Sequence, residues 1–123
     1  MKGRILLVED EMEIASSLKM GLEREGYEVD LFCNPRKALN CYKCGEYDLL
    51  MLDIIMPEIN GYELAHTIKT RDPKPPVWFV SASDPCLKYF VKKYPNIEGS
   101  IFIQKPVSLR ELKTRLNRKF KTP

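Results

Sequence analysis

The sequence lacks any long apolar run. Its longest stretch without a charged residue is nine residues, from Pro75 to Ser83, whereas a helix that crosses a bilayer needs about 20 predominantly apolar residues. Near the N-terminus the apolar run from Ile5 to Val8 is followed at once by three acidic residues, so it is too short for the core of a signal peptide. We therefore expect a cytoplasmic protein that neither spans nor binds a membrane.

Histidine is almost absent, with His66 alone, and there are four cysteines. Cys41 and Cys44 form a C-x-x-C pair. A structural zinc site needs a second pair of ligands, and a thioredoxin-like pair lies at the start of a helix that follows a strand. In a cytoplasmic protein we interpret the four cysteines as inert reduced thiols. We expect His66 to be an exposed residue of a helix.

The composition shows neither disorder nor an extreme charge. Of the 123 residues, 44% are hydrophobic and 30% are charged, which is close to the average of globular domains, and the length suits one domain. The formal net charge of +3 is too small to indicate a nucleic acid or membrane partner. The charge is nevertheless uneven, because residues 1–85 carry 10 basic and 15 acidic residues, whereas residues 86–123 carry 10 basic and 2 acidic residues.

Short apolar runs alternate with helical patterns along the chain. Five runs predict strands: Ile5–Val8, Val29–Phe32, Tyr47–Leu52, Val77–Val80 and Ile101–Ile103. Between them, apolar residues recur at helical spacing, and Asn34 before Pro35 is a typical helix start. We expect the second helix to reach Gly45 and the fourth to run from about Pro85 to Tyr94. This alternation predicts an α/β fold of five βα units, with a doubly wound parallel sheet covered on both faces.

Polar residues follow the predicted strands. Glu9 and Asp10 follow the first strand, Asp53 the third, Ser81 the fourth and Lys105 the fifth. Ligands of such sheets bind where the C-terminal ends of the strands meet. Carboxylates held close together favour a bound cation, and hard oxygen ligands favour Mg²⁺. With a lysine and a hydroxyl nearby, this edge suits a phosphoryl group, although each residue alone is also compatible with a surface charge or a helix cap.

Four stretches of sequence carry a family resemblance: ILLVEDE (5–11), YDLLMLDIIMPEINGYEL (47–64), VSA (80–82) and QKP (104–106). In this order they resemble the receiver domains of two-component response regulators (the CheY-like superfamily), over nearly the whole chain. The resemblance implies a flavodoxin-like sheet with the strand order 2-1-3-4-5. It also implies that residues 1–121 form the receiver (response regulatory) domain, with no output domain in this chain.

The resemblance assigns roles in phosphorylation to single residues. Asp53 would be the phosphoacceptor, and Lys105 and Ser81 would contact the phosphoryl oxygens. Ser81 and Phe102 would be the switch residues, and we expect Phe102 to favour a buried orientation because an outward ring exposes apolar surface. The peptide bond between Lys105 and Pro106 would be cis, a form that proline allows.

The resemblance also assigns the metal ligands. Asp10, Asp53 and the backbone carbonyl of Ile55 would bind Mg²⁺ directly, with Mn²⁺ as a possible substitute, and Glu9 would act through water. Ile55 and Ser83 occupy two family positions that tune hydrolysis of the phosphoryl group. Neither side chain is suited to orient an attacking water, so we predict a phosphorylated form that lasts for minutes or longer.

The predicted function is that of a signalling phosphoacceptor rather than an enzyme with a substrate of its own. It would receive a phosphoryl group from a sensor histidine kinase or a phosphotransfer protein and then control a downstream protein. The basic fourth helix, fifth strand and fifth helix are either a solvated face or the surface for an acidic partner. The segment from Tyr94 to Ser100 lacks the paired acids with which many receivers dimerise.

Two alternatives remain at this point. The chain is compatible with the receiver part of a longer DNA-binding transcription regulator, although we expect no direct binding of nucleic acid by the receiver itself. The second alternative is a small phosphatase with an aspartyl nucleophile. Such an enzyme usually needs a second aspartate two residues after the first, where this chain has Ile55.

Overall fold

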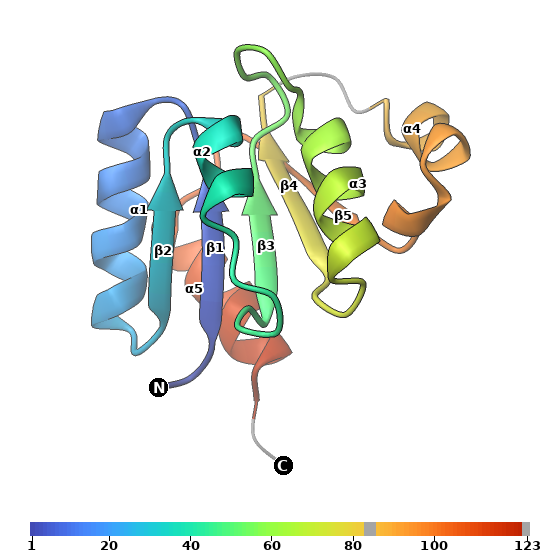
Figure 1. Cartoon of the computed structure of the whole chain (residues 1–123). Coiled ribbons are helices and arrows are strands. Elements are labelled where there is room, and N and C mark those ends of the chain that lie inside the picture. Colours follow the sequence, from blue (N-terminus) through green and yellow to red (C-terminus); the bar gives the residue numbers. More distant parts are fainter. Residues whose placement is uncertain (83–85, 122–123) are drawn as a thin grey trace.

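The computed structural model describes residues 1–82 and 86–121, in which strands and helices alternate (Figure 1). The strands are β1 (Arg4–Val8), β2 (Glu28–Phe32), β3 (Leu49–Leu52), β4 (Val77–Ser81) and β5 (Ile101–Gln104). The helices are α1 (Met12–Arg24), α2 (Pro35–Asn40), α3 (Gly61–Arg71), α4 (Leu87–Lys93), the 3-10 helix η1 (Pro95–Ile97) and α5 (Leu109–Lys119). The strands pair in parallel in the order β2-β1-β3-β4-β5, which confirms the predicted fold and strand order.

Helices cover both faces of the sheet, with α1 and α5 on one face and α2, α3 and α4 on the other (Figure 1). Successive residues of a strand point to opposite faces, so each central strand contributes side chains to two hydrophobic cores. Leu6 and Leu50 pack with residues of α2 and α3, whereas Ile5 and Leu49 pack with residues of α1 and α5. All of β3 is buried, as expected for a parallel strand between two helical layers.

The second helix is shorter than predicted, because α2 ends at Asn40 and does not reach Gly45. After the helix the chain turns toward the buried carboxylate of Asp72, which accepts hydrogen bonds from the Tyr42 hydroxyl at 2.8 Å and from the Gly45 backbone N–H at 3.1 Å. Gly45 has φ = +79°, a conformation that favours glycine. This residue therefore shapes a loop and does not end a helix.

The third strand begins at Leu49, two residues later than predicted, and the side chains of Tyr47 and Asp48 instead bond to residues of β2 and β1. The Tyr47 hydroxyl donates to Asp30 at 2.7 Å, and the Asp48 carboxylate accepts from the backbone N–H of Arg4 at 2.8 Å. Arg4 also forms an ion pair with Asp30 at 3.2 Å. Partial burial acts to raise the pKa of Asp30, but the Tyr47 hydrogen bond and the Arg4 charge outweigh it and hold this pKa below its ordinary value.

Helix α4 differs from the other helices because none of its residues is buried. It begins at Leu87, and Pro85, where we expected it to start, lies outside the described residues. The Phe90 ring stacks on Tyr62 of α3, with ring centroids 4.2 Å apart. Aromatic stacking of this kind contributes about 0.5–1.5 kcal/mol beyond the area buried. Part of the attachment of α4 thus comes from one aromatic contact with α3.

The prediction of an exposed His66 was wrong. Its ring is half-buried and stacks on Tyr94, with centroids 4.3 Å apart, and its Nδ1 lies 3.0 Å from Oδ1 of Asn96. The amide of Asn96 in turn donates to the backbone carbonyl of His66 at 3.1 Å. The η1 segment therefore folds back over α3 and covers this histidine.

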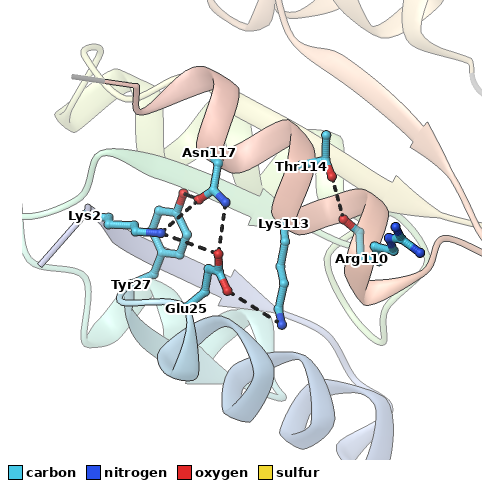
Figure 2. Close-up of polar contacts among 7 residues, drawn as sticks. All are labelled: Lys2, Glu25, Tyr27, Arg110, Lys113, Thr114 and Asn117. Atoms are coloured by element: carbon cyan, nitrogen blue, oxygen red, sulfur yellow. Dashed lines mark hydrogen bonds and ion pairs between the residues drawn. The ribbon is translucent and has the colours of Figure 1, made fainter. Parts of the chain in front are cut away.

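A polar network fixes α5 against the N-terminal part of the domain (Figure 2). Oδ1 of Asn117 accepts from the Tyr27 hydroxyl at 2.7 Å and from Lys2 at 3.3 Å, and the Asn117 amide donates to Glu25 at 3.0 Å. Lys113 adds an ion pair with Glu25 at 3.8 Å. The Asn117 hydrogen bond and the two lysines hold the pKa of Glu25 below its ordinary value. The inner side of α5 is thus bonded to the N-terminal segment before β1 and to the turn between α1 and β2.

The remaining sequence predictions concern membranes and thiols. In the part of the chain that the structure describes, no helix combines the length and the apolar character that a membrane span requires. All four cysteines are free thiols, and Cys41, Cys44 and Cys86 are exposed.

Candidate functional site

Three carboxylates meet at the C-terminal edge of the sheet. Glu9 and Asp10 directly follow β1, and Asp53 directly follows β3; one carboxylate oxygen from each lies within 4.8 Å of the others. Backbone hydrogen bonds hold both segments, since Glu9 donates to Phe32 at 3.1 Å and Asp53 donates to Val8 at 3.0 Å. Glu9 and Asp53 are buried, whereas Asp10 is exposed. The cluster therefore combines two buried carboxylates, Glu9 and Asp53, with the solvent-exposed carboxylate of Asp10.

A single ammonium group lies beside the two buried acids. Nζ of Lys105 is 2.8 Å from Oε2 of Glu9 and 3.6 Å from Oδ2 of Asp53. The backbone N–H of Lys105 donates to the carbonyl of Ser81 at 2.9 Å, and the peptide bond from Lys105 to Pro106 is cis. The lysine thus reaches the cluster from the strand pair β4–β5.

Burial changes the titration of these groups. Loss of solvent raises the pKa of Glu9 to about 7; the negative charge of Asp53 adds to this rise, and the hydrogen bond from Lys105 opposes it. For Lys105, burial disfavours the ammonium, but the Glu9 hydrogen bond and the Asp53 charge outweigh burial and raise the pKa of this lysine. Lys105 is therefore charged at neutral pH, while Glu9 titrates close to pH 7.

The cluster fits a divalent cation. Three carboxylates face one ammonium group, and Oε1 of Glu9 is buried without a hydrogen-bond partner among the described residues. An unsatisfied buried acceptor is costly, and a hard cation with oxygen ligands relieves this cost together with the repulsion between the acids. The arrangement of acids, lysine and the neighbouring strand end is suited to hold a charged phosphoryl group.

Comparison with known families decides the classification. The profile of the response regulator receiver domain matches residues 5–117 of the 123. The chain belongs to the response regulator receiver domain family. This receiver domain is similar in sequence to a probable transcriptional regulatory protein of Picosynechococcus, with 37% identity over 125 residues that cover 93% of the chain and 47% of the relative.

Two solved structures share the fold of this receiver domain. The non-phosphorylated HemR receiver domain of Leptospira biflexa has 32% identity and a TM-score of 0.83, and the match covers 98% of this chain and 96% of that one. The response regulator TrrA of Thermotoga maritima, in complex with Mg(2+)-BeF, has 32% identity and a TM-score of 0.75, covering 96% and 98%. The chain spans between 36% and 50% of the length of four curated relatives that it matches.

The loop after Asp53 in this receiver domain depends on Gly61, which belongs to the stretch 47–64 but whose close packing the sequence did not predict. The backbone N–H of Gly61 donates to the carbonyl of Ile54 at 2.7 Å, and a Cβ on Gly61 would lie 2.1 Å from the carbonyl oxygen of Asp53. The Asp53 side chain accepts from the backbone N–H of Ile54 at 2.7 Å. The start of α3 therefore packs directly on the backbone of Asp53, and only the Asn-Gly pair at 60–61 hinted at this.

Sequence reasoning also missed an ion pair between Arg36 of α2 and Glu58 of the same loop. Glu58 has φ = +70°, which is uncommon for a residue with a Cβ. No sequence signal pointed to this pair, because its partners are 22 residues apart in a loop and a short helix. The pair connects α2 with the loop that contains Ile55.

Two further predicted site residues, Ser81 and Phe102, belong to the strands β4 and β5. Ser81 is the buried last residue of β4, whereas we expected it just after the strand. Phe102 of β5 is half-buried and packs against the core on the α3 side of the sheet. The Ile55 side chain is 66% exposed. Ser83, the second predicted determinant of hydrolysis, lies outside the described residues.

Proposed function

We propose that Asp53 accepts a phosphoryl group from the phosphohistidine of a sensor histidine kinase or a phosphotransfer protein. The observation that carries this proposal is the position of its carboxylate. Asp53 is buried beside two further acids, and its Oδ2 lies 3.6 Å from the ammonium of Lys105. Glu9, the other buried acid, is already hydrogen-bonded to that ammonium at 2.8 Å. Asp53 is thus the acid with an oxygen available for attack next to a cation.

In the proposed step, a carboxylate oxygen of Asp53 forms a bond to phosphorus while the bond between phosphorus and the imidazole nitrogen breaks. The nitrogen keeps the electron pair of the broken bond, and a proton on the imidazole makes it a neutral leaving group. Lys105 would move its hydrogen bond from Glu9 toward a phosphoryl oxygen, and Ser81 would donate its hydroxyl to another. Such a transfer depends mainly on positioning and on neutralisation of charge.

Asp10, Asp53 and the backbone carbonyl of Ile55 would hold Mg²⁺, with Glu9 acting through water, and Mn²⁺ would serve as a substitute. The cation supplies positive charge to the phosphoryl oxygens. The Mg²⁺ in the complex of the similar protein TrrA supports this choice. The exposed and apolar side chain of Ile55 offers no group that orients a water for hydrolysis. We therefore propose that the phosphorylated form is long-lived.

The new phosphoryl group would pull Ser81 toward the site and shift the packing of Phe102, which changes the surface formed by α4, β5 and α5. This surface is basic, with Lys88, Lys92 and Arg118 among its exposed residues. We propose that it binds a downstream protein partner and that the receiver itself binds neither nucleic acid nor membrane. Residues 1–121 would form this domain, acting in the cytoplasm as a phosphoacceptor with no further enzymatic activity.

One alternative has specific support. Three of the curated relatives are transcriptional regulatory proteins by name, and the chain matches about half of their length or less. The receiver is therefore also compatible with the regulatory part of a longer DNA-binding regulator, in which the partner of the α4-β5-α5 surface is another domain of the same protein.

Incubation with Mg²⁺ and acetyl phosphate tests the proposed function. We expect the wild-type protein to gain one phosphoryl group by intact mass spectrometry, and Asp53→Asn to gain none, because an amide oxygen is a poor nucleophile. Asp48→Asn is the matched control, since Asp48 is exposed and its amide still accepts from Arg4. Labelling that persists in Asp53→Asn contradicts the proposal.

The raised pKa of Glu9 predicts a pH-dependent affinity for Mg²⁺. At pH 6 most of the Glu9 carboxyls are protonated, because the pKa is about 7. Binding of a cation favours the charged form, so affinity rises as pH rises through 7. Between pH 6 and pH 8 we expect a gain of about tenfold for a site that requires ionised Glu9, measured by isothermal titration calorimetry with Mg²⁺. Glu9→Gln should remove most of this dependence, and an equally steep dependence in that variant would contradict the assignment.

A further inference from the structure

The outer side of α5 carries a row of cations that form no ion pair with the described residues; Lys119 lies over the Phe120 ring, 5.8 Å from its centroid. Arg115, Arg118 and Lys119 are exposed, and none of them forms an ion pair with the described residues. Figure 2 shows the contrast along the helix: Lys113 points toward Glu25, whereas the side chain of Arg110 points away from this network. Because hydrogen bonds and an ion pair hold the inner side of α5 against the domain, the side chains on its outer side extend from a fixed helix.

Two hollows run along this side of α5. One, of about 600 Å³, is lined by Ser108, Arg110, Glu111, Thr114, Arg115 and Arg118. The other, of about 300 Å³, is lined by Trp78, Ile101, Arg115, Arg118 and Lys119. Arg115 and Arg118 line both hollows, so the two adjoin, and we call them together the α5 groove.

The two ends of the α5 groove differ in chemistry. At the β5 end, Ile101 is 44% exposed although it is a large apolar residue, and it lies beside Trp78 in the sheet. Toward the start of α5 the lining is polar and cationic, and Glu111 is its single acid. A ligand that matches this groove therefore needs an apolar group at the β5 end and acidic groups for the guanidinium groups along the rest.

We propose that the α5 groove binds a short, extended and acidic segment of a partner protein that has one apolar anchor. Guanidinium groups pair with carboxylates in a two-pronged geometry. The 11 residues of α5 span about 16 Å at 1.5 Å per residue, which an extended segment covers with about five residues. The anchor contacts Ile101 and Trp78, and the acidic side chains face Arg115, Arg118 and Arg110.

The distribution of charge argues against a second copy of this chain and against a nucleic acid as the occupant of the α5 groove. A second copy placed symmetrically on this groove brings like charges together, and the segment Tyr94–Ser100 contributes only the acid Glu98. A nucleic acid would place its phosphates beside Glu111 within the cationic part. The net charge of −5 over residues 1–85 also repels a long polyanion. A short acidic peptide avoids these penalties.

The inference rests on the proposed function, since it specifies the kind of partner that the receiver controls. The test is a ¹⁵N NMR titration of the full chain with a six-residue peptide of one leucine followed by acidic residues. We expect shifts at Ile101, Trp78 and the outer side of α5. Arg118→Glu should weaken binding about fivefold or more, and replacing the peptide leucine by serine about threefold. Arg24→Glu, at an exposed arginine of α1, is the matched control and should have little effect.

Several results would overturn the inference: equal losses in Arg24→Glu and Arg118→Glu, no effect of the leucine, or tighter binding of a DNA duplex or of anionic vesicles to the same residues. Arg115→Glu repeats the test if Arg118→Glu does not fold. Acetyl phosphate labelling of the same samples separates the two proposals. Failure of labelling contradicts the proposed function, whereas labelling without peptide binding contradicts the α5 groove alone.

Discussion

Replacing Lys105 with methionine is expected to slow phosphorylation by acetyl phosphate about 100-fold, the usual effect of removing one charged group from a site that stabilises a transition state. Methionine keeps most of the apolar stem but removes the ammonium that lies 2.8 Å from Glu9 and 3.6 Å from Asp53. The phosphoryl oxygens then lose a donor, and the two buried acids lose their neutralising charge. Initial rates of acetyl phosphate labelling, followed by intact mass, measure the effect.

Lys88→Met provides the control for this variant. Lys88 is an exposed lysine of α4 that forms no ion pair with any described residue. Its loss removes the same charge from the protein but leaves the site unchanged, so the rate should stay within about twofold of wild type. If Lys105→Met were as fast as Lys88→Met, the lysine would have no part in phosphoryl transfer.

The second large effect is expected from Gly61→Ala, which should destabilise the domain by about 3 kcal/mol. The new Cβ would lie 2.1 Å from the carbonyl oxygen of Asp53 and 2.9 Å from Cα of Ile54. Both are backbone atoms, so neither moves aside as a flexible side chain does. The start of α3 must shift, and the hydrogen bond from Gly61 to Ile54 is strained or lost. Urea denaturation followed by circular dichroism measures the loss of stability.

Gly3→Ala tests whether any added methyl group has the same effect. At Gly3 the nearest heavy atoms are ring carbons of Phe120 at 3.4 Å, an ordinary contact with a side chain. We expect a change below about 1 kcal/mol there. Equal losses in the two variants would show that the contact between Gly61 and Asp53 carries no special cost.

The sequence predicts which charged residues come together at the C-terminal edge of the sheet, because strand ends are local features. An apolar run followed by an acid, as at Val8-Glu9 and Leu52-Asp53, marks both the end of a strand and the chemistry beside it. Contacts between residues far apart in the chain are visible only in the structure. The pairing of Lys105 with Glu9 joins residues that are 96 positions apart, so no local pattern reports which acid the lysine contacts.

The wrong sequence predictions also concern features that depend on partners far along the chain. The second helix ends early and the third strand begins late because Asp72 and Asp30 accept hydrogen bonds from side chains far along the chain. His66 is covered by a segment that is 30 residues away. Helical periodicity describes which side of a helix faces the sheet, but it does not report what a later segment places on the other side.

The absence of buried residues in α4 has an energetic consequence. A helix that contributes little to the core can detach or unfold locally at a small fraction of the global free energy of unfolding. Its amide hydrogens should then exchange with solvent while those of β3 stay protected. A hydrogen bond to a charged group contributes about 1.5–3 kcal/mol. With Asp53 phosphorylated as proposed, one or two new bonds at the phosphoryl group would be enough to remodel this helix without disturbing the sheet that holds the acids.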